Sequence, residues 1–316
     1  MEERQPILSI CIPTYNRAEV LKQCLESIVT NNYFREDIEI VVSDNHSTDN
    51  TSSIVFEYSK HYSNIKYYRN KENIGGERNF IRVLNLATGR FRKLHNDYSV
   101  FTKEGLCVLY NAVLENIEER PLLLFGDWGA ESVSKKYFSD FNDFVRYTRF
   151  TLSWIGLHGF WESDFINMPD KDRKIETQFM QVDWCLRLFN KKKLLLLYEY
   201  PYVSRVYTSQ PQGGYDFFET HITKFLSVYR EYVESGDLTK ETYSYLCEQV
   251  CCFMLGWLDV LYFHIPKANT KQAYSYELQS PIKIFIHAFW KYPWFYYRSA
   301  KYILHLLRIK IKNILN

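Results

Sequence analysis

The sequence lacks the glycine-rich loops of the commonest nucleotide-binding proteins. Its glycine pair at Gly75-Gly76 fits neither the GxxxxGK[ST] nor the GxGxxG spacing. A P-loop and a dinucleotide-binding fingerprint are therefore not expected there.

Long apolar runs and a strong charge of either sign are also missing. No stretch offers about 18 uninterrupted apolar residues, so a membrane-spanning helix is not expected. The net charge is +2, and no overall field favours nucleic acid as a partner. Met1–Gln5 leads directly into an apolar strand, which predicts no signal peptide. These features favour an intracellular enzyme with one large domain, or one domain and an appendage.

The cysteines show no disulfide or metal pattern. There are seven, an odd number, in mostly apolar surroundings, which predicts reduced thiols in a cytosol. Cys251-Cys252 lies in an apolar helical run with no His or Cys partner at ligand spacing. We therefore expect this pair to pack in a core.

What the sequence does contain is a regular alternation of strands and helices. Short β-branched apolar runs at residues 7–12, 38–43, 65–68 and 91–95 predict buried parallel strands. Segments with helical apolar spacing separate them. This order predicts an α/β fold with a mostly parallel sheet and right-handed crossovers.

The pattern is less regular after residue 100. Helices are predicted at residues 102–118, 217–233 and 240–264, and strands at 121–126 and 194–198. Residues 127–175 are aromatic, polar and irregular. A segment of that length is typical of a binding element or a lid.

Polar motifs follow the ends of the predicted strands. They read Pro13-Thr14-Tyr15-Asn16-Arg17, Ser43-Asp44-Asn45 and His95-Asn96-Asp97, with Asn73–Asn79 before the third helix. In combination they resemble the opening of a family 2 glycosyltransferase with the GT-A fold. Such enzymes move a sugar from a nucleotide donor to an acceptor. The likeness is strong over about the first third of the chain and weak over residues 150–220.

The resemblance implies a domain plan. Residues 1–215 are expected to form the GT-A catalytic domain, with a donor-binding half at 1–100 and an acceptor-binding half at 101–215. A helical extension at 216–280 and a tail at 281–316 follow. Gln212–Asp216 resembles a loop that closes over the donor in capsule and exopolysaccharide members, and a simple connector is the alternative.

The resemblance also implies a donor site. The predicted donor-binding residues are Pro13, Thr14, Tyr15, Arg17, Asp44, Arg78, Asn96 and Asp97. Tyr15 can stack on the base, and Arg17 can reach a phosphate. Asp44 is expected to bind the base or ribose, with a turn cap as the alternative. Arg78 is a candidate for the base or diphosphate, and is otherwise a surface residue of a first helical turn.

Asp97 is the predicted metal ligand. The family carries an acidic motif here, often DxD, which holds a divalent cation against the diphosphate and stabilises the leaving group. Oxygen ligands and phosphate favour Mn²⁺ or Mg²⁺. This sequence reads His95-Asn96-Asp97-Tyr98, with one acid where two or three are usual, which weakens metal affinity in principle. A strand-end turn residue is the alternative.

An inverting transferase needs a base for the acceptor hydroxyl. The resemblance implies Asp183, and an acid stabilised by the helix dipole is the alternative. Asp127 and His158 are rival bases. The segment Trp154–Trp161 is predicted to contact the acceptor, with His158 and Trp161 as binding residues, because aromatic faces suit the CH surfaces of sugars. For His158 the alternative is a structural role.

The tail differs from the rest of the chain in charge. Residues 281–316 contain seven Lys or Arg residues and no Asp or Glu, interleaved with aromatic and aliphatic side chains. A basic, aromatic, amphipathic segment predicts peripheral association with an anionic membrane surface. Packing on the catalytic domain is the alternative.

Together these features predict an inverting, metal-dependent glycosyltransferase of bacterial surface glycan synthesis. By family habit the donor is a UDP-sugar, and the acceptor is a lipid-linked oligosaccharide or polysaccharide at the cytoplasmic membrane face. The alternative is a catalytically degenerate GT-A scaffold that binds partners, which only the thinned acidic motif favours. A sugar nucleotidyltransferase is poorly supported, because residues 7–17 contain no glycine.

Overall fold

A computed structural model of the chain describes residues 5–127, 129–206, 212–263 and 274–315. The chain divides into two compact units. Unit 1 contains Met1–Asp140, Leu152–Ile175 and Met180–Gln210, and unit 2 contains Phe141–Thr151, Glu176–Phe179 and Pro211–Asn316.

A five-stranded sheet forms the centre of unit 1. In spatial order its strands are β3 (Ile65–Arg69), β2 (Ile38–Asp44), β1 (Leu8–Thr14), β4 (Phe91–Leu94) and β8 (Gly159–Trp161). The first four are parallel, and β8 is antiparallel to β4. All residues of β2 and β4 are buried, as expected of parallel strands covered on both faces. The predicted α/β class and its four parallel strands are confirmed.

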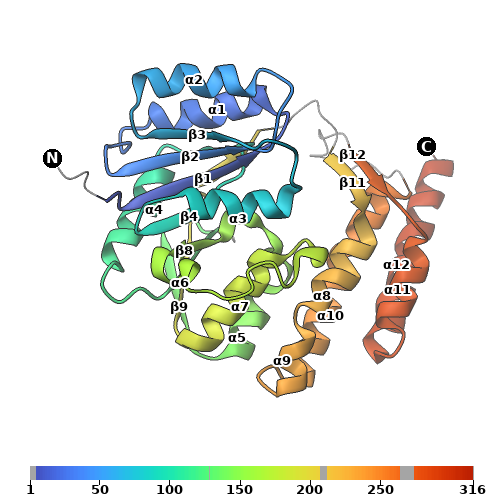
Figure 1. Cartoon of the computed structure of the whole chain (residues 1–316). Helices are drawn as coiled ribbons and strands as arrows, with labels where there is room; N and C mark the ends of the chain where they lie inside the picture. Colours follow the sequence, from blue (N-terminus) through green and yellow to red (C-terminus); the bar gives the residue numbers. More distant parts are fainter. Residues whose placement is uncertain (1–4, 128, 207–211, 264–273, 316) are drawn as a thin grey trace. The chain divides into compact units, whose positions relative to one another are not determined.

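Helices cover both faces of this sheet. The helices α1 (Ala18–Val29) and α2 (Thr51–His61) lie on one face and α3 (Gly76–Leu86) on the other (Figure 1). Right-handed crossovers require this arrangement, because the chain moves outward from β1 to β3 and then returns to β4. The strand order therefore reverses between β1 and β4. Ligands of such sheets bind at this switch point, beyond the carboxyl ends of the strands.

Unit 1 also contains a smaller sheet of β6 (Leu122–Gly126), β9 (Leu195–Glu199) and β7 (Ser134–Phe138), in that spatial order. β5 (Ser99–Phe101) pairs with β10 (Val203–Arg205). The helices α4 (Gly105–Glu115), α6 (Glu162–Ile166) and α7 (Met180–Lys192) belong to the same unit.

Residues 127–175 are more regular than predicted. They contain β7, β8, α6 and α5 (Phe141–Thr148), with short 3₁₀ helices. β7 pairs with β9 and β8 pairs with β4, and both partners are distant in the sequence. Local hydrophobic periodicity carries no information about such pairing, which explains the wrong prediction.

Unit 2 is mainly helical. Its helices include α8 (Phe225–Ser227), α9 (Arg230–Ser235), α10 (Lys240–Leu261), α11 (Pro281–Phe289) and α12 (Pro293–Leu315). The helix predicted at 217–233 is interrupted, because Glu219–Lys224 is π-helical. β11 (Gln212–Asp216) pairs in parallel with β12 (Tyr274–Glu277), so the predicted loop at 212–216 is a strand.

The two units differ from the predicted domain plan. Residues 216–280 and 281–316 belong to one unit, and α5 joins them although it was expected in the catalytic domain. Packing explains this. Phe141 stacks on Tyr232 with 5.1 Å between ring centroids, and Arg146 Nε donates to Thr242 Oγ1 at 3.1 Å.

Among the described residues, α10 is the one helix with the length and apolar composition of a membrane span. Core helices of water-soluble proteins share both properties. In α10, 44% of the apolar window is buried within the protein, including Leu246, Val250 and Met254. We interpret α10 as the core helix of unit 2.

Candidate donor site

A buried cluster lies at the switch point, where β1 and β4 end. Thr14 is the last residue of β1, and Asp97 follows β4 by three residues. Thr14 Oγ1 donates to Asp97 Oδ2 at 2.8 Å, and Arg17 Nη1 donates to Asp97 Oδ1 at 3.0 Å. Burial raises the pKa of Asp97, whereas Arg17 and Thr14 act to lower it. The fold thus brings together three of the predicted donor-site residues.

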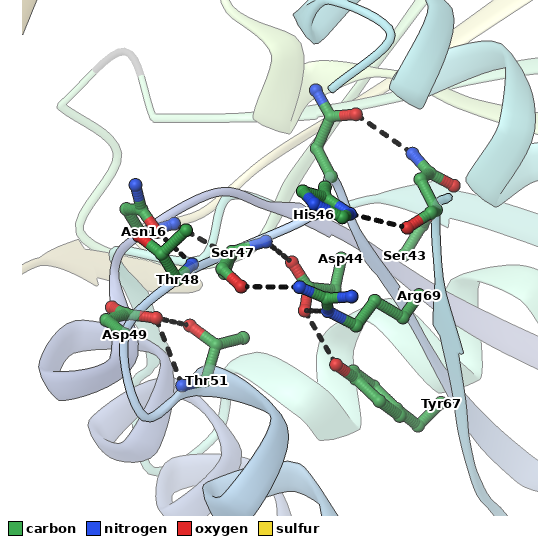
Figure 2. Close-up of polar contacts among 12 residues, drawn as sticks. Asn16, Ser43, Asp44, His46, Ser47, Thr48, Asp49, Thr51, Tyr67 and Arg69 are labelled. Atoms are coloured by element: carbon green, nitrogen blue, oxygen red, sulfur yellow. Dashed lines mark hydrogen bonds and ion pairs between the residues drawn. The ribbon is translucent and has the colours of Figure 1, made fainter. Parts of the chain in front are cut away.

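Asp44, the last residue of β2, is the centre of a second cluster (Figure 2). Its Oδ1 accepts the Ser47 backbone N–H at 2.8 Å, and its Oδ2 accepts the Tyr67 hydroxyl at 2.6 Å. Arg69 Nε lies 3.7 Å from Oδ2. Because Asp44 is fully buried, it positions these neighbours and does not present its carboxylate to solvent. This matches the turn-capping alternative.

The first two strand-to-helix turns are tied together (Figure 2). Asn16 has a φ of 51°, in the left-handed region that asparagine tolerates. Its backbone N–H donates to Ser47 Oγ at 2.9 Å, and its Oδ1 accepts the Thr48 N–H at 2.7 Å. Asp49 Oδ2 accepts the Ala18 N–H at 2.9 Å and so caps α1 from the neighbouring loop. The two motifs therefore form one connected platform.

An asparagine network that was not predicted as part of the site supports this platform. Asn79 Nδ2 donates to the Ser43 carbonyl at 2.8 Å. Asn70 Nδ2 donates to Asn45 Oδ1 at 2.9 Å, and Asn45 Nδ2 donates to Asn73 Oδ1 at 2.8 Å. Asn70 and Asn79 are buried, where a paired amide is stabilising and an unpaired one is costly. The dense asparagines around Gly75-Gly76 were the available sequence signal.

The other predicted donor residues are more accessible. Tyr15 is 44% exposed, and Pro13 and Asn96 are half-buried. Arg78 is exposed in the first turn of α3. Together with Arg17 and Arg69, these residues give the strand-end edge an accessible surface that is cationic and aromatic. The carboxylates of Asp44 and Asp97 at this edge are covered.

The described residues do not fit a divalent-cation site at Asp97. Within them, no group of three or more His, Cys, Asp or Glu side chains is placed to hold a metal ion. Asp97 is 2% exposed, and its oxygens are bonded to Thr14 and to the cation of Arg17. His95 is buried, its pKa is lowered by burial to about 3, and it bonds the Ser99 carbonyl at 3.0 Å. Asp97 forms an ion pair with Arg17, which would repel a second cation, so this arrangement does not favour the metal role, which stays a prediction.

The predicted acceptor segment borders this cluster. The Leu94 N–H donates to the His158 carbonyl at 3.0 Å, and Lys93 Nζ bonds the Gly156 carbonyl. A Cβ atom on Gly156 would lie 3.5 Å from Asn96 Nδ2. Gly156 and His158 therefore lie beside the end of β4 and Asn96.

The two acceptor contacts predicted in this segment are buried, which is a correction. Trp161 Nε1 donates to the Pro121 carbonyl at 2.7 Å, and its ring packs edge-on against Phe91. His158 donates to the Leu152 carbonyl at 2.8 Å, and burial lowers its pKa to about 3. Because the imidazole is fully buried, it does not reach the hydroxyl of an acceptor. Trp154 is 53% exposed and is the aromatic face that the segment offers. The sequence pattern did not distinguish among these aromatic residues.

Lys93 is a fully buried lysine that holds this segment. Its Nζ donates to the Leu94 carbonyl at 2.7 Å and to the Gly156 carbonyl. Burial lowers its pKa from 10.5 to about 7. Between these values the unfolded chain binds a proton that the folded chain lacks, so stability rises with pH.

From pH 7 to 8.5 we expect Lys93 to add about 1–2 kcal/mol to the free energy of unfolding. Urea unfolding at several pH values measures this. The Lys93→Met variant should lack this rise, because it has no group to titrate. A wild-type slope equal to that of Lys93→Met would contradict the prediction.

Asp183 lies in the first turn of α7, but its carboxylate is buried. Arg173 Nε lies 3.1 and 3.0 Å from its two oxygens, and Arg187 Nη1 lies 3.5 Å from Oδ2. A general base must reach the hydroxyl proton. A covered carboxylate shared by two arginines does not suit that role, so the geometry favours the structural alternative.

Asp127 is the exposed carboxylate among the predicted bases. It directly follows β6, and Leu124 of β6 forms an antiparallel bridge with His158. Because β8 is also antiparallel to β4, β6 runs in the same direction as β4. Asp127 therefore leaves its strand at the edge where Asp97 lies. Its Oδ1 accepts the Gly129 N–H at 2.7 Å.

Comparisons with known proteins agree with this architecture. The sequence model of Glycosyl transferase family 2 matches residues 9–116. The chain is 39% identical over 104 residues to abequosyltransferase RfbV of Salmonella typhimurium, which covers 33% of this chain and 31% of that protein. It is 37% identical over 89 residues to GalNAc(5)-diNAcBac-PP-undecaprenol beta-1,3-glucosyltransferase of Campylobacter jejuni, which covers 27% and 28%. The match thus spans about a third of each of these relatives.

A solved structure extends the likeness in fold. S. aureus TarS 1-349 in complex with UDP-GlcNAc has a TM-score of 0.55 and 17% identity, over 84% of this chain and 77% of that chain. At this identity the likeness concerns the fold, which is GT-A as predicted. Residues 9–116 match the family 2 model, as the motifs of the first hundred residues predicted.

Proposed function

We propose that this chain is an inverting glycosyltransferase of bacterial surface glycan synthesis. It moves a sugar from a nucleotide-diphosphate donor, with UDP as the nucleotide, to a lipid-linked glycan. The observation that carries this proposal is the Thr14–Asp97–Arg17 cluster at the switch point of a GT-A sheet. The relative that acts on an undecaprenol-linked glycan and the UDP-GlcNAc complex of TarS support the acceptor and the donor.

Each part of the site has its own role in the proposed reaction. The platform around Asp44 and Tyr15 receives the base and ribose, and Arg17 faces the diphosphate. Asp127 takes the proton of the acceptor hydroxyl while that oxygen attacks the anomeric carbon. The bond from this carbon to the phosphate oxygen breaks, and the nucleoside diphosphate leaves with the electron pair. No step is assigned to a metal ion, because the predicted ligand Asp97 is covered and paired with Arg17.

A donor panel tests the proposal. The protein is incubated with UDP-, GDP-, dTDP- and CDP-sugars, with and without Mn²⁺, and sugar release and thermal stabilisation are measured. We expect one class, the UDP-sugars, to stabilise the fold and to be turned over. Stabilisation without turnover in the presence of lipid-linked acceptors would favour the binding scaffold, and no response to any donor would refute the proposal.

We predict that Trp154 binds the acceptor. Its ring is exposed, and Gly156, two residues further on, lies beside Asn96. Stacking of an aromatic ring on a flat ligand face is worth about 1–3 kcal/mol, as measured for nucleic-acid bases. Trp154→Ala should therefore raise the acceptor KM by roughly tenfold or more and leave the donor KM within twofold. The exposed Phe56→Ala on α2 is the control. An unchanged acceptor KM would contradict the role.

The proposal includes a membrane-binding face on α11 and α12. One side of these helices packs within unit 2, where Phe285 and Phe289 are buried and Arg298 pairs with Glu248 at 2.8 Å. The other side exposes large apolar residues: Ile282, Ile286, Trp290, Tyr296, Tyr297, Ile303, Leu304 and Leu307. Exposed lysines, among them Lys283 and Lys291, lie between them. This combination suits an anionic interface. Packing on unit 2 and association with a membrane surface are therefore compatible.

Reversing two of these charges should release the protein from membranes. Each basic residue near an anionic surface contributes about 1 kcal/mol, so Lys283→Glu with Lys291→Glu is expected to weaken vesicle binding on the order of 30-fold. Cosedimentation with vesicles containing phosphatidylglycerol measures it. Lys22→Glu with Lys66→Glu, both exposed in unit 1, is the matched control. Equal sedimentation of the two variants would count against the surface.

A further inference from the structure

Two arginines from distant parts of unit 1 converge on Tyr98, next to Asp97. The Arg17 guanidinium carbon lies 5.5 Å from the Tyr98 ring centroid, and that of Arg205 lies 5.1 Å from it. Both distances are within the range of a cation–π contact. Arg205 was not among the predicted site residues.

The fold explains why Arg205 reaches this edge. β10 pairs antiparallel with β5, so that Arg205 is opposite Ser99, and the Val206 N–H donates to the Tyr98 carbonyl at 2.8 Å. This pairing brings the end of β10 against the segment that follows β4. No local sequence pattern connects positions 98 and 205.

The charges at this point are arranged to attract an anion. Asp97 is covered, whereas the Arg205 side chain is exposed and Arg17 is about one-third exposed. A ligand that approaches Tyr98 therefore meets two guanidinium groups and the Tyr98 ring, because the neighbouring carboxylate of Asp97 is covered. Guanidinium forks match phosphate oxygens in geometry and charge.

We propose that Arg17 and Arg205 bind the diphosphate of the donor and stabilise the leaving nucleoside diphosphate without a metal ion. This inference rests on the proposed function and assigns the charge role at that same site. Asp97 orients Arg17, through the 3.0 Å ion pair, and Tyr98 supports both cations. In the transition state the bond to the anomeric carbon breaks and negative charge grows on the diphosphate, where both arginines oppose it.

The affinities for UDP and for uridine, measured by calorimetry, distinguish contacts with the diphosphate from contacts with the nucleoside, because uridine has no phosphate. In Arg205→Ala we expect UDP affinity to fall on the order of 30-fold and uridine affinity to stay within about threefold. Arg17→Lys keeps a cation beside Asp97 but loses the fork, and should weaken UDP binding by about tenfold. Arg90→Ala, an exposed arginine just before β4 at the opposite edge, should behave like the wild type. Wild-type UDP affinity should be the same in EDTA and in Mn²⁺.

Three results would overturn the inference. One is UDP binding by Arg205→Ala and Arg17→Lys as tight as that of the wild type. Another is a wild-type UDP affinity that collapses in EDTA and returns with Mn²⁺. Either result leaves the proposed glycosyltransferase function intact. The third is wild-type protein that binds neither uridine nor UDP, which refutes the proposed function as well.

Discussion

The substitution Asp127→Asn is expected to lower the rate of sugar transfer by about 1,000-fold while leaving UDP affinity unchanged. A general base contributes roughly 10²–10⁴-fold, and the amide of Asp127→Asn cannot accept the hydroxyl proton. The carboxylate is exposed at the edge where Asp97 lies. It lies outside the platform that is proposed to receive the nucleobase, so the affinity for UDP should not change. Steady-state kcat with a lipid-linked acceptor, together with UDP calorimetry, measures both effects.

Asp183→Asn is the matched control. Asp183 is buried between Arg173 and Arg187, and the amide would leave these cations poorly paired. The free energy of unfolding should fall by about 2 kcal/mol, while kcat per folded molecule stays within tenfold of the wild type. If Asp183→Asn instead lost turnover at unchanged stability, and Asp127→Asn kept it, the base would be Asp183.

Asp44→Asn should have the second largest effect, on recognition of the nucleoside. The carboxylate accepts from the Ser47 N–H and the Tyr67 hydroxyl and lies against Arg69. The neutral amide keeps one acceptor oxygen but loses the other acceptor and the charge that faces Arg69, so uridine affinity is expected to fall on the order of 30-fold and stability by about 2 kcal/mol. Calorimetry with uridine and urea unfolding measure the two effects separately.

Tyr67→Phe isolates one of these contacts. It removes the hydroxyl that donates to Asp44 but keeps the ring and the ion pair with Arg69. We expect a stability loss of about 1 kcal/mol and uridine affinity within threefold of the wild type. A variant Asp44→Asn that bound uridine normally would show that the platform does not receive the base.

Local sequence was sufficient for the parallel part of the sheet and for its motifs. Buried parallel strands are short, apolar and β-branched, and this composition identifies β1, β2, β3 and β4 without knowledge of their partners. The order of elements then requires that the turns after these strands meet at one edge. The meeting of Thr14, Arg17 and Asp97 followed from that rule.

The exposure of the site side chains could not be predicted from local sequence. Sequence identifies which residues lie near the strand ends, but side-chain exposure depends on neighbours contributed by other segments. Trp161 and Trp154 look equally suited to stack on a sugar, yet Trp161 is covered by β4 and by the segment before β6, and Trp154 is not. Asp183 was selected by its place in a helix, whereas Arg173 and Arg187 decide its role.

The residue types and spacing of the first hundred positions alone therefore determined the fold class, the family and the edge where the site lies. Only the tertiary structure decided which charges remain available there. It buries Asp44 and Asp97 against their own partners and, through the pairing of β5 with β10, brings Arg205 to Tyr98. The physical reason is that periodicity is a local property, whereas desolvation and ion pairing depend on groups brought together by long-range strand pairing.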